Sequence, residues 1–414
     1  MKKILWLCNM VLPDFSHEFG IKKNNFGGWM TGLLHGLENV GEINISLCFP
    51  IMDRNRVKDG KCNGHNYYTF LCDINALSYN EELIEVFEKI LDKSAPDIVH
   101  IWGTEYPHTT AMILACKRKK ILGRVVINIQ GLVSICARHY LSGIPEEYKF
   151  WKGENGLSMD EERSIFEERG KCEVESIKMI RHIIGRTDWD RACVEAINSD
   201  IHYHTCNEVL RDSFYNNIGK WTYEECQKHS IFVSQASYPI KGFHYLLEAL
   251  PNVIRKFPDT HIYVAGPKFL SAEIKNPYSY YIEMLMRKYN LTEKILFLGN
   301  LNEEQMIHQY LKANVFVLSS SIENSPNSLK EARILGVPSI TSFVGGTYCG
   351  VSRRENTFFY PYDEPEVLAY YICKIFQNRI SKKVNKSYFL ALNHPSKCIE
   401  RNVNIYEKII EGML

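Results

Sequence analysis

The sequence predicts an α/β protein built from two Rossmann-like, doubly wound domains. Three observations point to this fold class. The chain has 414 residues, which is too long for one ordinary hydrophobic core. Short apolar, β-branched runs alternate with helical segments in both halves. Polar side chains follow several of these runs, at the strand ends where open parallel sheets bind ligands.

The first half alternates in the order expected of a parallel sheet. Amphipathic patterning predicts helices opening near residue 25 and spanning about 80–93. Apolar runs predict strands that end at residue 12 and that lie within 43–48, 67–71, 96–105, 124–129, 183–190 and 202–211.

Residues 132–182 interrupt this alternation with a glycine-containing turn and a charged helix over 159–179. An insertion of this length is typical of a lid or a binding surface, and a decorative excursion is the alternative. We therefore expect a first domain over 1–215 that carries this insertion, and a second domain over 216–395. The last helix, about 400–414, is expected to pack back on the first domain.

The second half repeats the strand–helix alternation, with helices expected near 241–253, 367–376 and 403–413. The strands are expected at 231–234, 261–266, 295–300, 315–318 and 337–341.

A short helix between the last two of these strands has an unusual beginning. Ser325 can cap it, Pro326 suits its first position, and Asn327 and Ser328 complete a small polar first turn next to Asn324. Such a helix start attracts phosphate through its backbone N–H groups and the positive end of its dipole.

Two carboxylates flank this helix start, Glu323 in the preceding loop and Glu331 in the second turn. Acids beside a phosphate site are best matched to hydroxyl groups, so a nucleotide sugar fits both features. The alternative is that both are solvated charges that only favour the helix dipole.

Paired glycines, Gly27 and Gly28, open the first helix and would let a ligand approach the backbone. Tight packing of helix against sheet is the alternative explanation. The loop lacks the Gly-x-Gly-x-x-Gly pattern, which weakens a nicotinamide or flavin interpretation.

Composition excludes several functional classes. Lys and Arg total 49 against 48 for Asp and Glu, so no global charge favours nucleic acid. The 13 cysteines form no Cys-x-x-Cys pair, which indicates reduced thiols in a cytoplasmic protein rather than a zinc site. The amino terminus resembles a signal peptide, but its polar interruption favours a buried strand. No run has the roughly 20 apolar residues of a membrane span.

The basic run 117–120 follows an apolar helix. It would suit peripheral contact with the cytoplasmic membrane, or it is a solvated helix end.

Several short motifs follow one another in the second half. They are Tyr238-Pro239-Ile240-Lys241-Gly242, Phe297-Leu298-Gly299, Glu323 and Glu331, Gly336-Val337-Pro338, and Val344-Gly345-Gly346. In this order and spacing they resemble the motifs of the retaining glycosyltransferases of family four, which have the GT-B fold. The resemblance spans almost the whole chain and is strongest from Phe232 to Gly346.

The resemblance implies two Rossmann-like domains facing across a cleft, and it implies roles for the matching residues. Lys241 would contact the donor diphosphate, Glu323 the donor sugar and Glu331 the ribose. Asn327 and Ser328 would contact phosphate through N–H groups, and Gly299 and Asn300 would lie by the base. The first domain would bind the acceptor, for which the candidate residues are Trp102, Glu105, Arg138, Arg186 and Asp188.

Two positions depart from the family pattern. Ser234-Gln235 replaces Gly-Arg after the first strand of the second domain, which removes one phosphate-binding cation. Gln130-Gly131 replaces His-Gly, and Gln130 can donate and accept hydrogen bonds but cannot titrate. The Gln-Gly variant, together with Gly185-Arg186-Thr187-Asp188-Trp189-Asp190, resembles a bacterial capsule or surface-polysaccharide branch of the family.

We therefore expect a retaining glycosyltransferase that moves a sugar from a nucleotide-sugar donor to a hydroxyl of a glycan or lipid-linked acceptor. No cofactor or metal is expected, because lysine and backbone dipoles can carry the diphosphate charge and no Asp-x-Asp cluster is present. The alternatives are a nucleotide-sugar epimerase of similar fold and a catalytically weak partner subunit, the latter suggested by Gln130 and Gln235.

Overall fold

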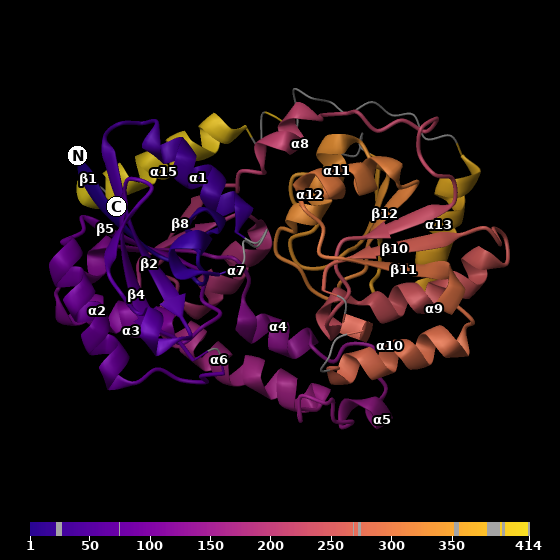
Figure 1. The fold of residues 1–414 in the computed structure, drawn as a ribbon, viewed down its shortest axis with the longest axis horizontal. Helices are drawn as coiled ribbons and strands as arrows, with labels where there is room; N and C mark the ends of the chain where they lie inside the picture. The colour runs from indigo at the N-terminus through magenta and orange to yellow at the C-terminus, as the bar shows by residue number, and fades with distance from the viewer. Residues whose placement is uncertain are drawn as a thin grey trace. The chain divides into compact units, whose positions relative to one another are not determined.

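The computed structural model describes residues 1–21, 27–73, 75–267, 269–271, 275–351, 356–378, 390 and 394–412. The chain forms two compact units (Figure 1). Unit 1 comprises Met1–Ile135, Ile165–Arg211 and Leu392–Leu414, and unit 2 comprises Cys136–Ser164 and Asp212–Ala391. Helices α4 (Val133–His139) and α6 (Met159–Met179) each contain a point where the chain passes from one unit to the other.

Within the described residues, unit 1 contains an eight-stranded sheet in the order β3-β4-β2-β1-β5-β6-β7-β8. Neighbouring strands pair in parallel, except that β3 runs antiparallel to β4. From β4 onward this is the doubly wound order in which the first strand lies inside the sheet. The strands are β1 (Lys2–Leu7), β2 (Ile43–Ile51), β3 (Gly60–Cys62), β4 (His65–Leu71), β5 (Ile98–Trp102), β6 (Val125–Asn128), β7 (His182–Gly185) and β8 (His202–Thr205).

The helices of unit 1 present apolar faces to this sheet. In α2, Asn80 caps the amino end by accepting from the Leu83 N–H at 2.9 Å, and Ile84 and Phe87 are buried. Strand β5 is buried at every position, as expected for a parallel strand covered on both faces. The helices are α1 (Gly28–Glu38), α2 (Glu81–Ser94), α3 (His108–Arg118), most of α6, α7 (Asp188–Ile197) and α15 (Pro395–Ile410).

The last helix, α15, packs against α1 within unit 1 (Figure 1). Lys2 Nζ donates to Glu407 Oε1 at 2.7 Å, and the buried Tyr406 hydroxyl lies 2.6 Å from His100 Nδ1. The carboxyl-terminal helix therefore completes the core of the unit that the amino terminus begins.

Unit 2 contains, in the part of the chain that the structure describes, a six-stranded parallel sheet in the order β11-β10-β9-β12-β13-β14. This is the 3-2-1-4-5-6 Rossmann order. The strands are β9 (Ser230–Val233), β10 (His261–Ala265), β11 (Ile295–Gly299), β12 (Val315–Leu318), β13 (Ser339–Ser342) and β14 (Thr357–Tyr360). The helices are α5 (Glu146–Lys149), α8 (Asp212–Asn216), α9 (Phe243–Ile254), α10 (Pro277–Lys288), α11 (Glu303–Lys312), α12 (Asn327–Leu335) and α13 (Pro365–Gln377). The predicted fold class of two Rossmann-like domains is confirmed.

Part of the expected insertion belongs with the second unit. Residues 136–164 group with unit 2, and Ile144 and Met159 lie in the same apolar cluster as α9 and α10. The whole of 132–182 was expected in the first domain, because sequence order alone gives no sign of this packing. The observed boundary therefore differs from the expected one.

Two local predictions are wrong, and two strands were missed. Strand β1 ends at Leu7 instead of residue 12, because Asn9 leaves the sheet to bond Glu105 and His108. Strands β3 and β14 were not anticipated. Ser325 does not cap α12: Pro326 occupies the cap position, and no side-chain cap bond forms.

Candidate active site

A partly buried ion pair joins Lys241 and Glu323, which are 82 residues apart in the sequence. Lys241 Nζ donates to Glu323 Oε1 at 2.6 Å, and the two side chains are only 16% and 13% exposed. Ser320 Oγ donates to the same oxygen at 2.8 Å. Burial by itself lowers the pKa of Lys241, but the Glu323 charge and the neighbouring Tyr238 outweigh it and raise that pKa. Lys241 is therefore a permanent cation held in a desolvated place.

Two glycines fix the loop that carries Glu323. Gly242 has φ +63°, and a Cβ there would lie 1.9 Å from the Ser319 carbonyl oxygen. Gly345 has φ +49°, and a Cβ there would lie 1.9 Å from the Glu323 carbonyl oxygen. Both positions combine left-handed backbone with direct backbone contact, so a larger residue cannot be accommodated without movement. These glycines lie in the Lys241-Gly242 and Gly345-Gly346 motifs.

Helix α12 begins beside this loop and carries Glu331. Asn327 and Ser328 are its first residues, so their N–H groups lie in the turn that has no intrahelical acceptors. Glu331 is 9% exposed and its Oε2 accepts from the Tyr310 hydroxyl at 3.1 Å. The same hydroxyl lies 3.0 Å from the Ser328 carbonyl oxygen. Tyr310, which the sequence analysis did not single out, therefore orients Glu331 on the helix start.

The other predicted donor residues of unit 2 lie at carboxyl ends of its strands. Gln235 follows β9 and is half-buried, and the Gly266 backbone lies against it. Gly299 ends β11 with φ +77°, and the next residue, Asn300, is exposed. Asn324 is buried in the loop before α12. Parallel strands bring these ends to one edge of the sheet, so the second unit gathers the predicted donor residues there.

In unit 1, Gly27 and Gly28 form the start of α1 as predicted. Gly27 has φ +76° and is the helix cap residue. A Cβ at Gly28 would lie 3.1 Å from Arg211 Cδ, so the Arg211 side chain lies over this turn. The structure thus adds a cation, Arg211, that sequence reasoning did not place near the paired glycines.

Gln130 lies after β6 and is half-buried. Its Nε2 donates to Asn128 Oδ1 at 2.8 Å, and its backbone carbonyl accepts from Arg186 Nη2 at 2.7 Å. Arg186 also pairs with Glu208 at 2.5 Å, and both side chains are 4% exposed. Arg186 was predicted as an acceptor-side residue, but its buried side chain holds the Gln130 backbone in place.

The remaining acceptor-side predictions divide by exposure. Asp188 and Arg138 are exposed, on α7 and α4 respectively. Trp102 is 2% exposed and stacks on His100 at a ring separation of 4.4 Å, so it belongs to the core of unit 1. Burial there leaves no face of Trp102 for an acceptor.

Glu105 is partly buried after β5 and is held by two donors. Its Oε2 accepts from Asn9 Nδ2 at 2.9 Å and its Oε1 accepts from the Gly131 N–H at 3.2 Å. Burial raises the pKa of Glu105 to about 7, with a further contribution from the Glu173 charge. Glu105 therefore changes its protonation state near neutral pH.

Raising the pH from 4.5 to about 7 is expected to lower the free energy of unfolding through Glu105. In this window the unfolded chain has already lost the proton that the folded state keeps, so stability falls as pH rises, by roughly 2 to 3 kcal/mol in all. Glu105→Gln should lack this component. Urea unfolding of both proteins across the window measures it, and identical pH profiles would contradict the assignment.

Glu173 of α6 is a buried acid that sequence reasoning missed. It is 0% exposed and accepts from Thr104 Oγ1 at 2.6 Å and from the N–H groups of Val133 and Ser134 at 2.9 and 3.0 Å. It thereby satisfies the first N–H groups of α4 and fixes the loop before Glu105. No local signal distinguishes it from the other charges of its helix.

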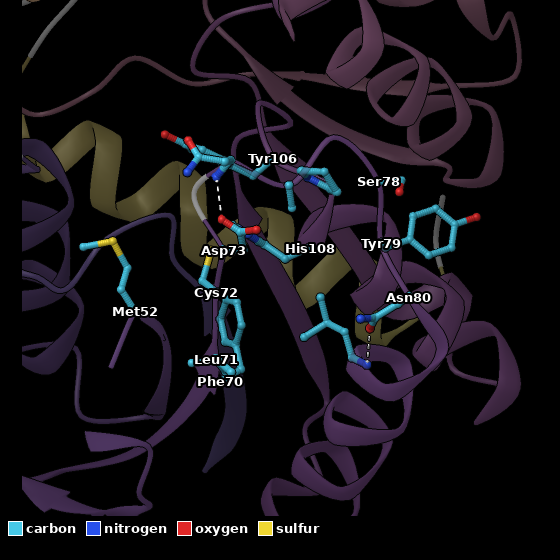
Figure 2. Close-up of a pocket in the computed structure, with 14 residues that line it drawn as sticks. Met52, Phe70, Leu71, Cys72, Asp73, Ser78, Tyr79, Asn80, Tyr106 and His108 are labelled. Atoms are coloured by element: carbon cyan, nitrogen blue, oxygen red, sulfur yellow. Dashed lines mark hydrogen bonds between the residues drawn. The ribbon is translucent and has the colours of Figure 1, made fainter. Parts of the chain in front are cut away.

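A hollow of about 480 Å³ lies in unit 1 at the ends of β4 and β5 and the starts of α2 and α3 (Figure 2). Its lining is mainly apolar and aromatic with one acid, one histidine and amides, and it includes none of the predicted site residues. The lining residues are Met52, Phe70, Leu71, Cys72, Asp73, Asn75, Ala76, Ser78, Tyr79, Asn80, Leu83, Tyr106, Pro107 and His108.

The basic run 117–120 is partly neutralised by acids of α2. Arg118 Nη2 donates to Glu81 Oε2 at 2.9 Å, and Lys119 Nζ donates to Asp92 Oδ2 at 2.7 Å. These pairs reduce the local positive charge on which the membrane-contact hypothesis depends. Across the described ranges, no helix combines the length and hydropathy needed to cross a bilayer.

Residues 216–388 match the family model for glycosyl transferases group 1. An uncharacterized glycosyltransferase of Methanocaldococcus jannaschii is 24% identical over 206 residues, 49% of this chain and 49% of that protein. The UDP-Gal:alpha-D-GlcNAc-diphosphoundecaprenol alpha-1,3-galactosyltransferase of Escherichia coli is 33% identical over 124 residues, 29% of this chain and 30% of that protein. The chain thus spans half the length or less of these curated relatives. Their descriptions give the epimerase alternative no support.

Solved structures match the chain over its whole length. Sucrose-phosphate synthase from Thermosynechococcus elongatus has a TM-score of 0.72 at 14% identity, covering 100% of both chains. The Anabaena protein HepE, in complex with UDP and glucose, has a TM-score of 0.64 at 13% identity, covering 98% of this chain and 100% of that one. The chain therefore has the GT-B fold of glycosyltransferases, and its residues 216–388 match the group 1 glycosyl transferase family.

Proposed function

We propose that this protein is a retaining glycosyltransferase that moves a sugar from a nucleotide-sugar donor to an acceptor hydroxyl. The observation that carries the proposal is the partly buried Lys241–Glu323 pair next to the start of α12, with Glu331 in the same helix. Lys241 is complementary to a diphosphate, Glu323 to the hydroxyls of a sugar, and Glu331 to those of a ribose. The match of residues 216–388 to the group 1 family covers all three residues.

Lys241 would stabilise the leaving diphosphate. As the bond to the sugar breaks, negative charge grows on the phosphate oxygens, and a desolvated ammonium stabilises that charge more strongly than an exposed one. In the structure, Glu323 neutralises Lys241. Donor binding would bring the diphosphate to the lysine and leave the Glu323 carboxylate to accept from the sugar hydroxyls.

The N–H groups of Asn327 and Ser328 would share the diphosphate charge with Lys241, since a helix start favours anions. These N–H groups would stand in for the phosphate-binding cation that the family has at the position of Gln235. The acceptor would enter on the same face of the sugar as the departing diphosphate, whose oxygen could take the acceptor proton. Configuration at the sugar would then be retained, and no carboxylate need attack.

We place the acceptor on unit 1. The carboxyl ends of its strands and the nearby helix starts carry Gln130, Glu105 and Asp188, and they also line the hollow beside α2 and α3. The E. coli relative is named for transfer to a diphosphoundecaprenol-linked sugar. By analogy we propose a glycan or lipid-linked acceptor in surface-polysaccharide assembly.

Incubation with a panel of nucleotide sugars tests the function. Nucleotide release that depends on an added acceptor, with an α-linked product from an α-linked donor, supports retaining transfer. Nucleotide binding without turnover for any donor and acceptor would instead support the weak partner subunit that Gln130 and Gln235 suggest.

Glu331→Ala is expected to weaken nucleotide binding by about 10- to 100-fold, because a hydrogen bond to a charged group contributes about 1.5 to 3 kcal/mol. Titration calorimetry with the nucleoside diphosphate measures the effect. Glu293→Ala, at an exposed acid of the same unit, is the control. Unchanged affinity in Glu331→Ala would show that this residue does not hold the ribose.

A further inference from the structure

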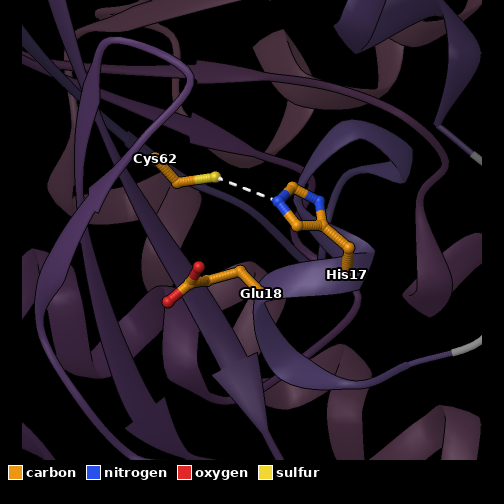
Figure 3. A group of neighbouring side chains, drawn as sticks. All are labelled: His17, Glu18 and Cys62. Carbon is orange, nitrogen blue, oxygen red and sulfur yellow. Dashed lines mark hydrogen bonds between the residues drawn. The ribbon is translucent and has the colours of Figure 1, made fainter.

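Three side chains of types that can bind a metal ion lie close together in unit 1, and none of them is among the predicted site residues (Figure 3). His17 and Glu18 lie in the 3-10 helix η1 (Pro13–Phe19), and Cys62 ends β3. One potential ligand atom from each residue lies within 4.8 Å of the others. His17 is exposed, Glu18 is partly exposed and Cys62 is buried, so the group opens to solvent on one side.

The spacing of the histidine and the cysteine suits a tetrahedral ion. His17 Nε2 lies 3.8 Å from Cys62 Sγ. Bond lengths of about 2.3 Å to sulfur and 2.0 Å to nitrogen place two such ligand atoms about 3.6 Å apart. Glu18 Oε1 accepts from Lys58 Nζ and from the Tyr67 hydroxyl, both at 2.7 Å, so a cation bound by this carboxylate would compete with these two donors.

The two segments that supply the ligands are already held together by other contacts. Lys58 Nζ donates to the Glu18 carbonyl at 3.2 Å, Arg56 Nη1 to the Phe19 carbonyl at 2.7 Å, and Asn63 Nδ2 to the Asp14 carbonyl at 3.0 Å. A metal ion would therefore bind ligands that are already close together, and little conformational entropy would be lost on binding.

The turn after Cys62 fixes the direction of its side chain. Asn63 and Gly64 have φ +50° and +85°, and Cys62 pairs with His65 in the antiparallel ladder. This is the two-residue Asn-Gly hairpin, whose geometry sets the register of both strands. Since register decides which face a strand residue points to, Cys62 is held toward η1.

The sequence predicted no zinc site, because Cys62 is distant in sequence from His17 and Glu18 and only the fold brings them together. We propose that His17, Glu18 and Cys62 form a site for a divalent cation of the zinc class, with a fourth position open to water. Thiolate, imidazole and carboxylate together match zinc, whereas magnesium and calcium prefer oxygen ligands alone. The Cys62 thiol releases its proton on binding, so the cation displaces one proton there. Lys58, which now pairs with Glu18, competes with the cation for that carboxylate.

Cobalt(II) titration of the full-length protein tests the site without reference to catalysis. The wild-type protein is expected to bind one Co²⁺ with a near-ultraviolet thiolate-to-cobalt charge-transfer band, which Zn²⁺ displaces. Cys62→Ser should abolish the band, and His17→Gln, at an exposed position, should weaken Co²⁺ binding by at least about tenfold. Lys58→Met should strengthen binding, because it removes the competing cation.

Cys72→Ser is the matched control, since Cys72 is another free thiol of unit 1, partly exposed and outside the cluster. Circular dichroism confirms that each variant is folded, and His17→Gln keeps the test decisive if Cys62→Ser does not fold. Absence of the band in the wild type, or a band that survives in either Cys62→Ser or His17→Gln at wild-type affinity, overturns the proposal.

Discussion

Lys241→Met is expected to lower the rate of sugar transfer at saturating substrates by about 100- to 1,000-fold, the loss typical of removing one group that stabilises developing charge. Methionine keeps a flexible side chain of similar length next to Tyr238 but carries no charge. Because the lysine side chain is only 16% exposed, few water molecules can reach the position of its ammonium. Nucleotide release with a saturating donor and acceptor measures the rate.

The same substitution also affects stability, and the two effects can be separated. Without the ammonium, the Glu323 carboxylate stays buried without its counter-charge, and breaking such a pair costs about 3 to 5 kcal/mol. The double variant Lys241→Met/Glu323→Gln removes both charges and is expected to regain most of the stability while staying inactive. Urea unfolding of the two variants gives the comparison.

The outcome that contradicts this role of Lys241 is specific. If folded Lys241→Met kept a rate within about tenfold of the wild type, the diphosphate charge would be stabilised elsewhere. A double variant that recovered activity together with stability would show that the pair is structural only.

Gly345→Ala is expected to impair both stability and turnover. The residue has φ +49°, and its new Cβ would meet the Glu323 carbonyl oxygen, to which the Gly346 N–H donates at 3.0 Å. Backbone strain costs about 1 to 3 kcal/mol, and the clash forces the Glu323 loop to move as well. A displacement of about 1 Å at a reacting group can lower the rate about 100-fold.

Gly156→Ala separates the strain from the displacement. Gly156 lies in the same unit with φ +78°, but no other atom lies within 4 Å of the position of a Cβ. The Gly156→Ala variant should be destabilised by a similar amount of backbone strain and should keep its activity. If Gly345→Ala and Gly156→Ala matched in both urea unfolding and turnover, Gly345 would not hold the Glu323 loop.

The sequence was most informative where burial is continuous. Strand β12 (Val315–Leu318) coincides with its predicted range, because its apolar run is too short for a typical helix and consists of β-branched, aromatic and aliphatic residues. Strand β14 is only partly buried, and β3 has three residues, so neither produces such a pattern. The Asn63-Gly64 turn was the available signal for β3.

The site could be predicted only in part, because contacts between distant segments leave no local trace. Lys241, Glu323 and Glu331 were selected one by one as ligand contacts, and no pattern indicated that the first two form a pair. Trp102 was expected among the acceptor-side residues because it ends a strand, yet its ring stacks on His100 inside unit 1. In the sequence, Glu173 cannot be told from the other charged residues of its helix, and only the fold shows that it is buried.

The path of the chain between the two units constrains how the protein can be divided. The chain leaves unit 1 after Ile135, returns after Ser164, leaves again after Arg211 and re-enters before α15. A fragment that ended at Arg211 would lack α15 and would carry Ile144 and Met159 without the apolar cluster that buries them. Neither unit is a continuous piece of sequence, so we expect limited proteolysis in the loops to leave the halves associated, and separate expression of either half to give insoluble protein.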